Sequence, residues 1–275
     1  MPNRQENVLI FKDTERMCSS NPKLVESIRN SRQKQQIFLE KDIVEKGNNK
    51  NDKPIEIVVS KKRSLEAAMN YEGQKICVLN FASATNPGGG VTRGSSAQEE
   101  CLCRCSTLYV NLNIDKCIKE FYIPHRKAKN YLYNDDCIYT PDVTVFKTDS
   151  SKPEIMKEQD WYHVNVITCA APNLRVYAGD YKGNTMLNRK GIKELHLKRG
   201  RRILDIAKAN GNEVIILGAF GCGAFRNPPE IVAEAYSELL EEYKYDFKIV
   251  EFAVYCPPRD EINYQIFKKI LERRN

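Results

Sequence analysis

The spacing of apolar and polar positions separates a polar first segment from a more regular remainder. Asn21-Pro22 predicts a helix start, because asparagine caps a first turn and proline is tolerated at its first position. The segment 46–54 (KGNNKNDKP) predicts a loop, since it is rich in Asn, Gly and charge. Residues 1–50 are therefore predicted to be a helical extension with a loose apolar face formed by Leu24, Val25, Ile28, Ile37 and Phe38.

From residue 55 onward, β-branched runs alternate with amphipathic stretches. Strands are predicted at 55–60, 75–84, 137–147, 161–172, 213–220 and 248–255. Helices are predicted at 64–73, 97–112, 193–211, 228–243 and 260–274, with a long irregular middle at 113–160. Strands that alternate with helices indicate an α/β fold with a mostly parallel sheet covered on both faces. We expect one such domain at 51–275.

Composition narrows the class of protein. The 275 residues contain no apolar run of about 18, so no membrane span is expected. The first residues lack the apolar core of a secretion signal, so the ten cysteines are interpreted as reduced thiols of a cytoplasmic or nuclear protein. The formal net charge of +7 favours an anionic partner, although lysine-rich surfaces can also serve solubility alone.

Two of the predicted strands run directly into glycine-rich loops, VLNFASATNPGGG and IILGAFGCGAFRNPP. Ligands of open α/β sheets bind outside the carboxyl ends of the strands. Each loop also leads into a helix, whose first N–H groups attract anions, and glycines let the backbone approach a ligand closely. The pair of loops therefore predicts a ligand with more than one phosphate.

The first loop is followed by paired carboxylates, Glu99 and Glu100. Its glycines fit neither the dinucleotide fingerprint nor the P-loop, so a flexible turn is the simple alternative. The carboxylates also have a simple alternative, because the helix dipole favours acidic residues in a first turn. Neighbours on a helix point about 100° apart, so two such groups would divide roles rather than flank one bond.

Metal binding is not expected. Cys101, Cys103 and Cys105 form C-x-C-x-C, but the chain has no C-x-x-C pair and its three histidines are scattered. Small core residues are the better interpretation of these cysteines.

Together these segments resemble the poly(ADP-ribose) glycohydrolases of the bacterial or microbial type, a branch of the macrodomain superfamily. The resemblance rests on GGG followed seven residues later by QEE, on NFASATNPGGG, AQEECLCRCSTLY and YTPDVTVF, and on LGAFGCGAFRNPP. It spans about residues 55–255. It implies a macrodomain-like three-layer α/β/α fold with a mixed, mostly parallel sheet, in which residues 51–275 form the catalytic domain.

The resemblance also implies roles for individual residues. Glu100 matches the catalytic glutamate, which protonates the departing ribose oxygen and then activates water, and Glu99 matches the carboxylate that orients ribose hydroxyls. An acid that works near neutral pH needs a raised pKa, and burial or a charged neighbour can supply it. The substrate-binding residues implied are Gln98, Asn86, Gly88, Gly89, Gly90 and Val91 in the first loop, and Gly218, Gly221, Cys222, Gly223, Ala224 and Phe225 in the second.

The expected function is hydrolysis of the ribose–ribose bonds of poly(ADP-ribose) to release ADP-ribose, without cofactor or metal. The expected partners are poly(ADP-ribose), ADP-ribose and poly(ADP-ribosyl)ated proteins, and the protein is expected to be a monomer. Two alternatives share the fold. One is a non-catalytic domain that reads ADP-ribose, and the other is a hydrolase of mono(ADP-ribose) on protein or nucleic acid.

Overall fold

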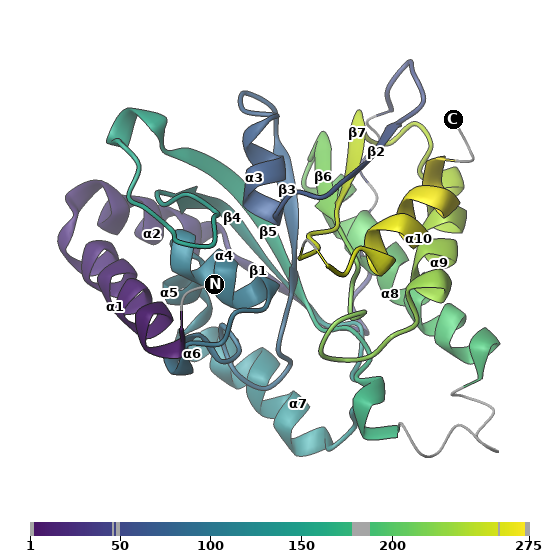
Figure 1. The fold of residues 1–275 in the computed structure, drawn as a ribbon, viewed down its shortest axis with the longest axis horizontal. Coiled ribbons are helices and arrows are strands. Elements are labelled where there is room, and N and C mark those ends of the chain that lie inside the picture. The colour runs from purple at the N-terminus through teal and green to yellow at the C-terminus, as the bar shows by residue number, and fades with distance from the viewer. Residues whose placement is uncertain (1–2, 46, 48–49, 178–187, 258, 273–275) are drawn as a thin grey trace.

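A seven-stranded sheet forms the centre of the computed structural model, which describes residues 3–45, 47, 50–177, 188–257 and 259–272 (Figure 1). The strand order is β1-β4-β5-β3-β6-β7-β2. β5, β3, β6, β7 and β2 run parallel, whereas β4 is antiparallel to both of its neighbours. This confirms the mixed, mostly parallel sheet. The strands are β1 Gln36–Phe38, β2 Glu56–Ser60, β3 Ile76–Phe81, β4 Cys137–Val145, β5 Tyr162–Cys169, β6 Val214–Leu217 and β7 Ile249–Ala253.

Helices cover both faces of the sheet. In Figure 1, α8, α9 and α10 lie to the right of it, and α1, α2, α4 and α5 lie to the left. None of the helices within the described ranges is long and apolar enough to cross a membrane. The α-helices are α1 Arg4–Ser20, α2 Pro22–Lys34, α3 Ser64–Met69, α4 Gln98–Cys105, α5 Leu108–Leu112, α6 Asp115–Cys117, α7 Ile123–Ala128, α8 Arg189–Ala209, α9 Pro229–Glu242 and α10 Ile262–Leu271. Shorter turns are η1 Val91–Arg93, η2 Ile118–Tyr122, η3 Glu158–Asp160 and η4 Leu174–Tyr177.

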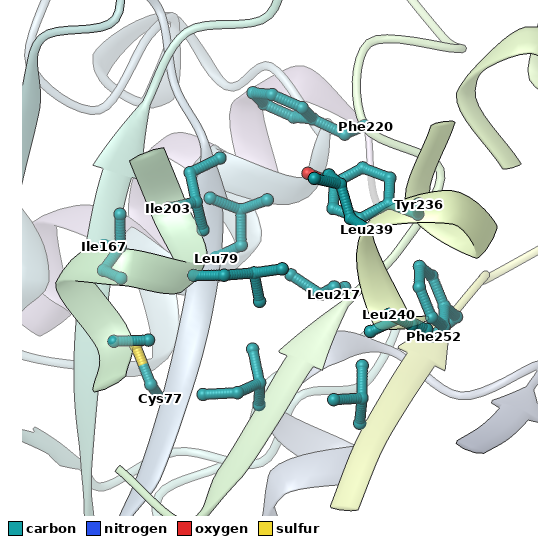
Figure 2. Close-up of a cluster of buried hydrophobic side chains, with 14 of the residues drawn as sticks. Cys77, Leu79, Ile167, Ile203, Leu217, Phe220, Tyr236, Leu239, Leu240 and Phe252 are labelled. Atoms are coloured by element: carbon teal, nitrogen blue, oxygen red, sulfur yellow. The ribbon is translucent and has the colours of Figure 1, made fainter. Parts of the chain in front are cut away.

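The central strand β3 divides its side chains between two cores, because successive residues of a strand point to opposite faces. Cys77 and Leu79 pack toward α8 and α9 in a cluster that also holds Leu217 and Leu239 (Figure 2). Ile76 and Val78 belong to the opposite core, beneath α3, α4 and α5. Burial on both faces explains why this strand reads as a continuous apolar run.

The sequence prediction was wrong in three places. Ile37 and Phe38 lie in β1, which pairs with β4, rather than on a helix, so residues 1–50 are not helical throughout. The helix predicted at 97–112 is broken between α4 and α5, where Ser106 makes a bridge to Val145. The middle at 113–160 is not irregular throughout, because α6, η2 and α7 follow one another over 115–128.

Other predictions hold. Asn21 caps α2, since its side chain accepts from the N–H groups of Lys23 and Leu24. The last predicted helix, 260–274, corresponds to α10, and residues 273–274 lie outside the described ranges, as do parts of the predicted 46–54 loop. The division at residue 50 stays a prediction.

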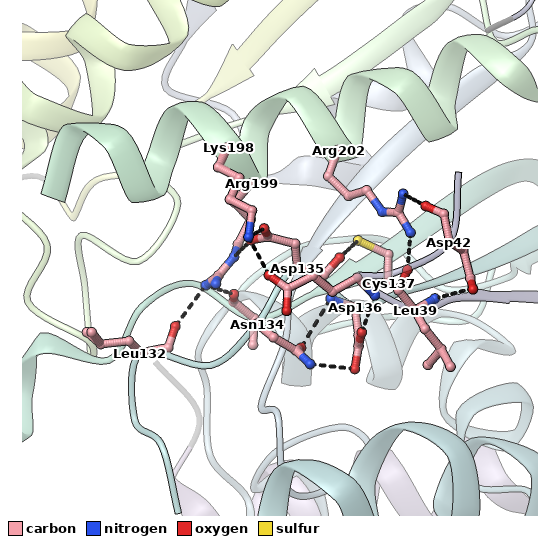
Figure 3. A network of polar contacts seen from close by, with 12 residues as sticks. Leu39, Asp42, Leu132, Asn134, Asp135, Asp136, Cys137, Lys198, Arg199 and Arg202 are labelled. Atoms are coloured by element: carbon pink, nitrogen blue, oxygen red, sulfur yellow. Dashed lines mark hydrogen bonds and ion pairs between the residues drawn. The ribbon is translucent and has the colours of Figure 1, made fainter. Parts of the chain in front are cut away.

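A buried polar network joins α8 to the start of β4 and the end of β5 (Figure 3). Arg199 is 1% exposed and pairs with Asp135 over 2.9 Å. Its Nη1 donates to the carbonyls of Ala170 (2.7 Å) and Leu132 (3.2 Å). A buried guanidinium is tolerated where a carboxylate and carbonyls surround it. The network fixes α8 against the edge of the sheet where the two glycine loops begin.

Candidate active site

The two glycine loops meet because their strands are neighbours. β3 and β6 are adjacent and parallel, so the loops that follow Phe81 and Leu217 leave the same edge of the sheet. A cavity of about 320 Å³ lies between them. Its wall includes Phe81, Ser96, Ala97 and Gln98 from the first loop and α4, Gly221, Gly223, Ala224 and Phe225 from the second, and Ala171, Val254, Tyr255 and Asn263 from neighbouring segments.

Gln98 fastens the start of α4 to β3. Its Oε1 accepts from the N–H of Phe81 (2.9 Å), and its Nε2 donates to Leu79 O (2.7 Å) and to Ser64 Oγ (3.0 Å). Both ends of the amide are therefore used within the protein. Gln98 lines the cavity, but its side chain first serves to hold the two following glutamates in place.

Glu99 is 3% exposed and well supplied with donors. Its Oε2 accepts from the N–H of Ser83 (2.7 Å), and its Oε1 accepts from Asn80 Nδ2 (3.3 Å). Burial raises the pKa of Glu99 to about 8, and the nearby Glu100 carboxylate adds to the rise, while the hydrogen bond from Ser83 opposes it. The side chain is thus largely protonated at neutral pH, as expected for a buried carboxyl beside another acid.

Glu100 is 7% exposed, and one of its two carboxylate oxygens is hydrogen-bonded within the protein. Its Oε1 accepts from the N–H of Gly90 over 2.8 Å. Its Oε2 has no hydrogen-bond partner among the described residues, although it is buried. Buried polar atoms in native structures normally have a partner, and an exception points to a catalytic role or to a group still to be bound.

The glycine triplet closes around these carboxylates. Gly88 and Gly89 have φ of +63° and +58°, in the left-handed region. A Cβ on Gly89 would lie 2.6 Å from Glu100 Oε1 and 2.9 Å from Glu99 Oε2. A Cβ on Gly88 would meet Tyr109, and one on Gly90 would collide with Ser95 Oγ. Only glycine fits here, because the acids and their neighbours occupy the space.

Of the site residues predicted in the first loop and at the start of α4, Gln98 lines the cavity, whereas Glu99, Glu100, the glycines 88–90, Asn86 and Val91 are not among its described lining residues. Asn86 is exposed, and its Nδ2 donates to Thr85 Oγ1 (3.0 Å). Val91 is fully buried at the start of η1 and packs in the core. Neither residue lines the cavity, and the substrate contacts implied for them stay predictions.

In the second loop, the glycines differ from one another. Gly221 has φ +79°, and a Cβ there would lie 2.5 Å from Asn227 Nδ2. A Cβ on Gly223 would have no atom within 4 Å, so this residue faces open space. Gly218 and Cys222 do not line the cavity. A Cβ added to Gly218 would lie 2.7 Å from the carbonyl oxygen of Ala253, so this glycine is closely packed.

Asn227 and His196 brace this loop, and no motif in the sequence marks them as a pair. Asn227 is 1% exposed and donates to Pro172 O (2.7 Å) and Gly221 O (3.1 Å). Its Oδ1 bonds His196 Nε2 (2.8 Å), and burial lowers the pKa of His196 to about 4, so the imidazole is neutral. The Asn-Pro-Pro sequence that follows the loop is the feature that could have indicated a structural role for Asn227.

Asn80 was also missed. It is 0% exposed near the end of the apolar strand β3, where an unsupported amide would be costly. A polar residue inside the run ICVLNF is a signal that sequence reading could have used. Within the described ranges, no group of three or more His, Cys, Asp or Glu side chains is placed to hold a metal ion.

A family model and several solved structures similar to this chain describe the same class of protein. The family model of the microbial-type PARG catalytic domain matches residues 5–148. No curated protein matches the sequence significantly. Similar solved structures include the poly(ADP-ribose) glycohydrolase of Thermomonospora curvata, at 27% identity and a TM-score of 0.85, with 97% of this chain and 99% of that chain covered.

Two ligand complexes are also similar to this structure. The T. curvata enzyme bound to the inhibitor ADP-HPD shares 27% identity, with a TM-score of 0.83 and coverage of 98% of this chain and 100% of that one. The poly(ADP-ribose) glycohydrolase of Deinococcus radiodurans in complex with ADP-ribose shares 30% identity, with a TM-score of 0.77 and coverage of 90% and 98%.

Proposed function

This chain belongs to the microbial-type poly(ADP-ribose) glycohydrolase family, and from that membership we propose that it cleaves poly(ADP-ribose) with Glu100 as the acid and base. It is a glycohydrolase of the macrodomain-like fold. The observation that carries the assignment of roles is the hydrogen bonding of Glu100, which has one oxygen fixed by Gly90 N–H and the other left without a partner among the described residues.

The proposed reaction takes its roles from the family and assigns them to the Glu100 carboxyl. Protonated Glu100 gives its proton to the bridging ribose oxygen as the bond to the anomeric carbon breaks, and the distal ribose becomes oxocarbenium-like. The same carboxylate then accepts a proton from water, whose oxygen bonds to the anomeric carbon. Atoms balance, because one water is consumed and Glu100 ends protonated as it began. Because the hydrogen bond from Gly90 holds Oε1 in place, it also fixes the orientation of Oε2, the oxygen that would transfer the proton.

Glu99 has a different role in this proposal. Its pKa of about 8 keeps it largely neutral at neutral pH, and its oxygens already accept from Ser83 and Asn80. A neutral carboxyl can both accept from and donate to ribose hydroxyls. In this form Glu99 places no full negative charge beside Glu100.

The second loop and the cavity would hold the rest of the ADP-ribose unit. Gly223 and Ala224 are exposed at the cavity wall, where their N–H groups can donate to a diphosphate. The rings of Phe81, Phe225 and Tyr255 offer flat apolar surface suited to a ribose and an adenine. A cavity of about 320 Å³ falls within the range of small-ligand pockets.

The test is Glu100→Gln, which keeps the side-chain shape and removes the acid. We expect release of ADP-ribose from purified polymer to fall by about 10³-fold or more, while ADP-ribose binding measured by calorimetry stays within a few-fold. Polymer and mono(ADP-ribosyl)ated substrates are compared side by side. Turnover of mono substrates alone would indicate a mono(ADP-ribose) hydrolase, and binding without any turnover by the wild type would indicate a reader.

The substrate polymer, the monomeric state and the cytoplasmic or nuclear location remain parts of this proposal. Light scattering during size-exclusion chromatography measures the mass directly. A dimer would contradict the monomer that we propose.

A further inference from the structure

The first helix, α1, contacts the far end of the catalytic glycine loop. Asn7 is 4% exposed, and its Nδ2 donates to Gly94 O over 3.1 Å. Gly94 has φ +75°, and any Cβ there would collide with the carbonyl oxygen of Arg4. The backbone of α1 therefore rests directly on the loop, with a buried amide as the polar contact between them.

The end of the loop that Asn7 holds is tied to Glu100 through backbone hydrogen bonds. The N–H groups of Arg93 and Ser95 both donate to Gly90 O, over 2.9 and 3.1 Å. The N–H of Gly90 is the donor to Glu100 Oε1. A displacement of Gly94 would therefore move the peptide groups on both sides of Gly90, and with them the only hydrogen bond of the Glu100 carboxylate found in the described ranges.

Two more contacts from α1 reach the same unit. The ring of Phe11 packs edge-to-face on Tyr109, with centroids 4.8 Å apart, and Tyr109 in turn lies 2.8 Å from where a Cβ of Gly88 would stand. Thr14 Oγ1 donates to Arg104 O, near the end of α4, over 2.6 Å. α1 thus contacts the end of the loop directly, reaches its beginning through Tyr109, and also contacts the helix that carries Glu100.

α1 is itself firmly anchored. Lys147, which follows β4, is 2% exposed and extends its ammonium group to α1. It pairs with Asp13 Oδ2 (2.8 Å) and donates to Ile10 O (3.0 Å) and Thr14 Oγ1 (2.9 Å). A buried ammonium needs such partners, so the arrangement holds α1 in one position against the sheet.

We propose that α1 is a positioning element of the active site, in which Asn7 holds the loop 88–94 in place and so keeps the N–H of Gly90 on Glu100. This role lies outside the glycine and glutamate motifs. Asn7 also lies in the wall of the cavity, but its Nδ2 is committed to Gly94 O, so we assign it a positioning role through the loop rather than a catalytic one. The kinetic part of its test rests on the proposed function, whereas the exchange part does not.

The variant is Asn7→Asp, which keeps the shape of the side chain and loses the N–H donor. We expect kcat to fall about 10-fold or more and KM to change by less than kcat, because a displaced acid weakens the chemical step more than binding. Amide exchange of peptides that cover 88–96 should become faster. Protonation of the new carboxyl restores a donor, so the kcat ratio of variant to wild type should rise as the pH falls from about 8 to 5.5.

The matched control is Asn212→Asp. Asn212 is 3% exposed and donates to Ala207 O over 2.8 Å, but it precedes β6 at the opposite edge of the sheet. It should lose thermal stability to a similar extent while kcat and the exchange of 88–96 stay unchanged. Asn7→Ala should show the kcat loss without the recovery at low pH, and it replaces Asn7→Asp if that variant does not fold.

The inference is wrong if Asn7→Asp loses no more kcat than Asn212→Asp, or if exchange of 88–96 is unchanged in both Asn7 variants. Should the wild type release no ADP-ribose, the proposed function fails, and the exchange measurement alone decides whether α1 holds the loop.

Discussion

The two glycine loops leave neighbouring strands at one edge of the sheet, but their glycines have different physical roles. In the first loop a Cβ on Gly88, Gly89 or Gly90 would strike a side chain of the protein itself. In the second loop a Cβ on Gly223 would meet nothing within 4 Å. The first loop is crowded at all three glycines by Glu99, Glu100 and neighbouring side chains, whereas in the second loop Gly221 packs against Asn227 and Gly223 is open toward the cavity.

The difference shows that a glycine-rich loop at a strand end has two distinct physical meanings. In one, the absence of a side chain makes room for catalytic carboxylates, and the backbone N–H groups bind those carboxylates. In the other, the absence leaves N–H groups accessible to a ligand. The sequence pattern alone does not separate the two, because both appear as glycine after an apolar strand.

The strongest test of this contrast pairs Gly89→Ala with Gly223→Ala. Alanine at 89 adds a Cβ 2.6 Å from Glu100 Oε1 at a φ of +58°, so the acid must move. We expect kcat to fall about 10³-fold, near the full contribution of a general acid. Gly223→Ala should keep kcat within about threefold and act mainly on KM, because the chemical groups are undisturbed. Steady-state kinetics on purified polymer measures both, and equal kcat losses would refute the contrast.

A second test uses the proton of Glu99. Its pKa of about 8 in the folded protein lies above the ordinary value of 4.5, so between these pH values the unfolded chain releases a proton that the folded protein keeps. The contribution of Glu99 to folding stability is therefore fully present below about pH 4.5 and is lost as the pH rises toward 8. Glu99→Gln removes this loss. The free energy of unfolding of the variant, relative to that of the wild type, should therefore increase by about 1.4 kcal/mol per pH unit as the pH rises across that window.

Urea unfolding of wild type and Glu99→Gln at several pH values measures this difference. The same comparison with Glu230→Gln, an exposed position at the start of α9 after the second loop, provides a control with little expected change. A flat difference between pH 5 and 8 would show that Glu99 is ionised in the folded protein.

The smallest effect is expected in the second loop. Asn227→Ala removes two donations to carbonyls and leaves His196 Nε2 without its partner. We expect a stability loss of about 1–3 kcal/mol and a KM increase of roughly 10-fold, with kcat nearly unchanged. The measurements are thermal unfolding and steady-state kinetics. A loss confined to kcat would place this brace in the chemical step and weaken the distinction between the loops.

Much of this arrangement could be read from local sequence patterns. β3, β6 and the helices that follow are strongly patterned, and β-branched runs beside glycine signal a strand that ends in a loop. The roles of Glu99 and Glu100 came from resemblance to a family. The raised pKa falls on Glu99, the carboxyl expected to orient the substrate, and its cause is burial by segments that lie far apart in the chain.

What could not be predicted depends on contacts between residues far apart in the chain. β1 is three residues long and forms only by pairing with β4, so its local pattern resembles the end of a helix. The break at Ser106 follows from a bridge to Val145. The docking of Asn7 on Gly94 joins residues 87 positions apart, and no spacing rule anticipates it.

The pairing of edge strand β2 with β7 has a consequence for how the protein is made. β2 emerges from the ribosome early, but Glu56 must wait for Ile249, its partner in the register. At ordinary synthesis rates that delay is roughly 10 to 40 s. During this interval an unpaired strand edge is exposed to other nascent chains. Slow translation or a shortage of chaperones should therefore reduce the yield of soluble protein before any change in its activity is seen.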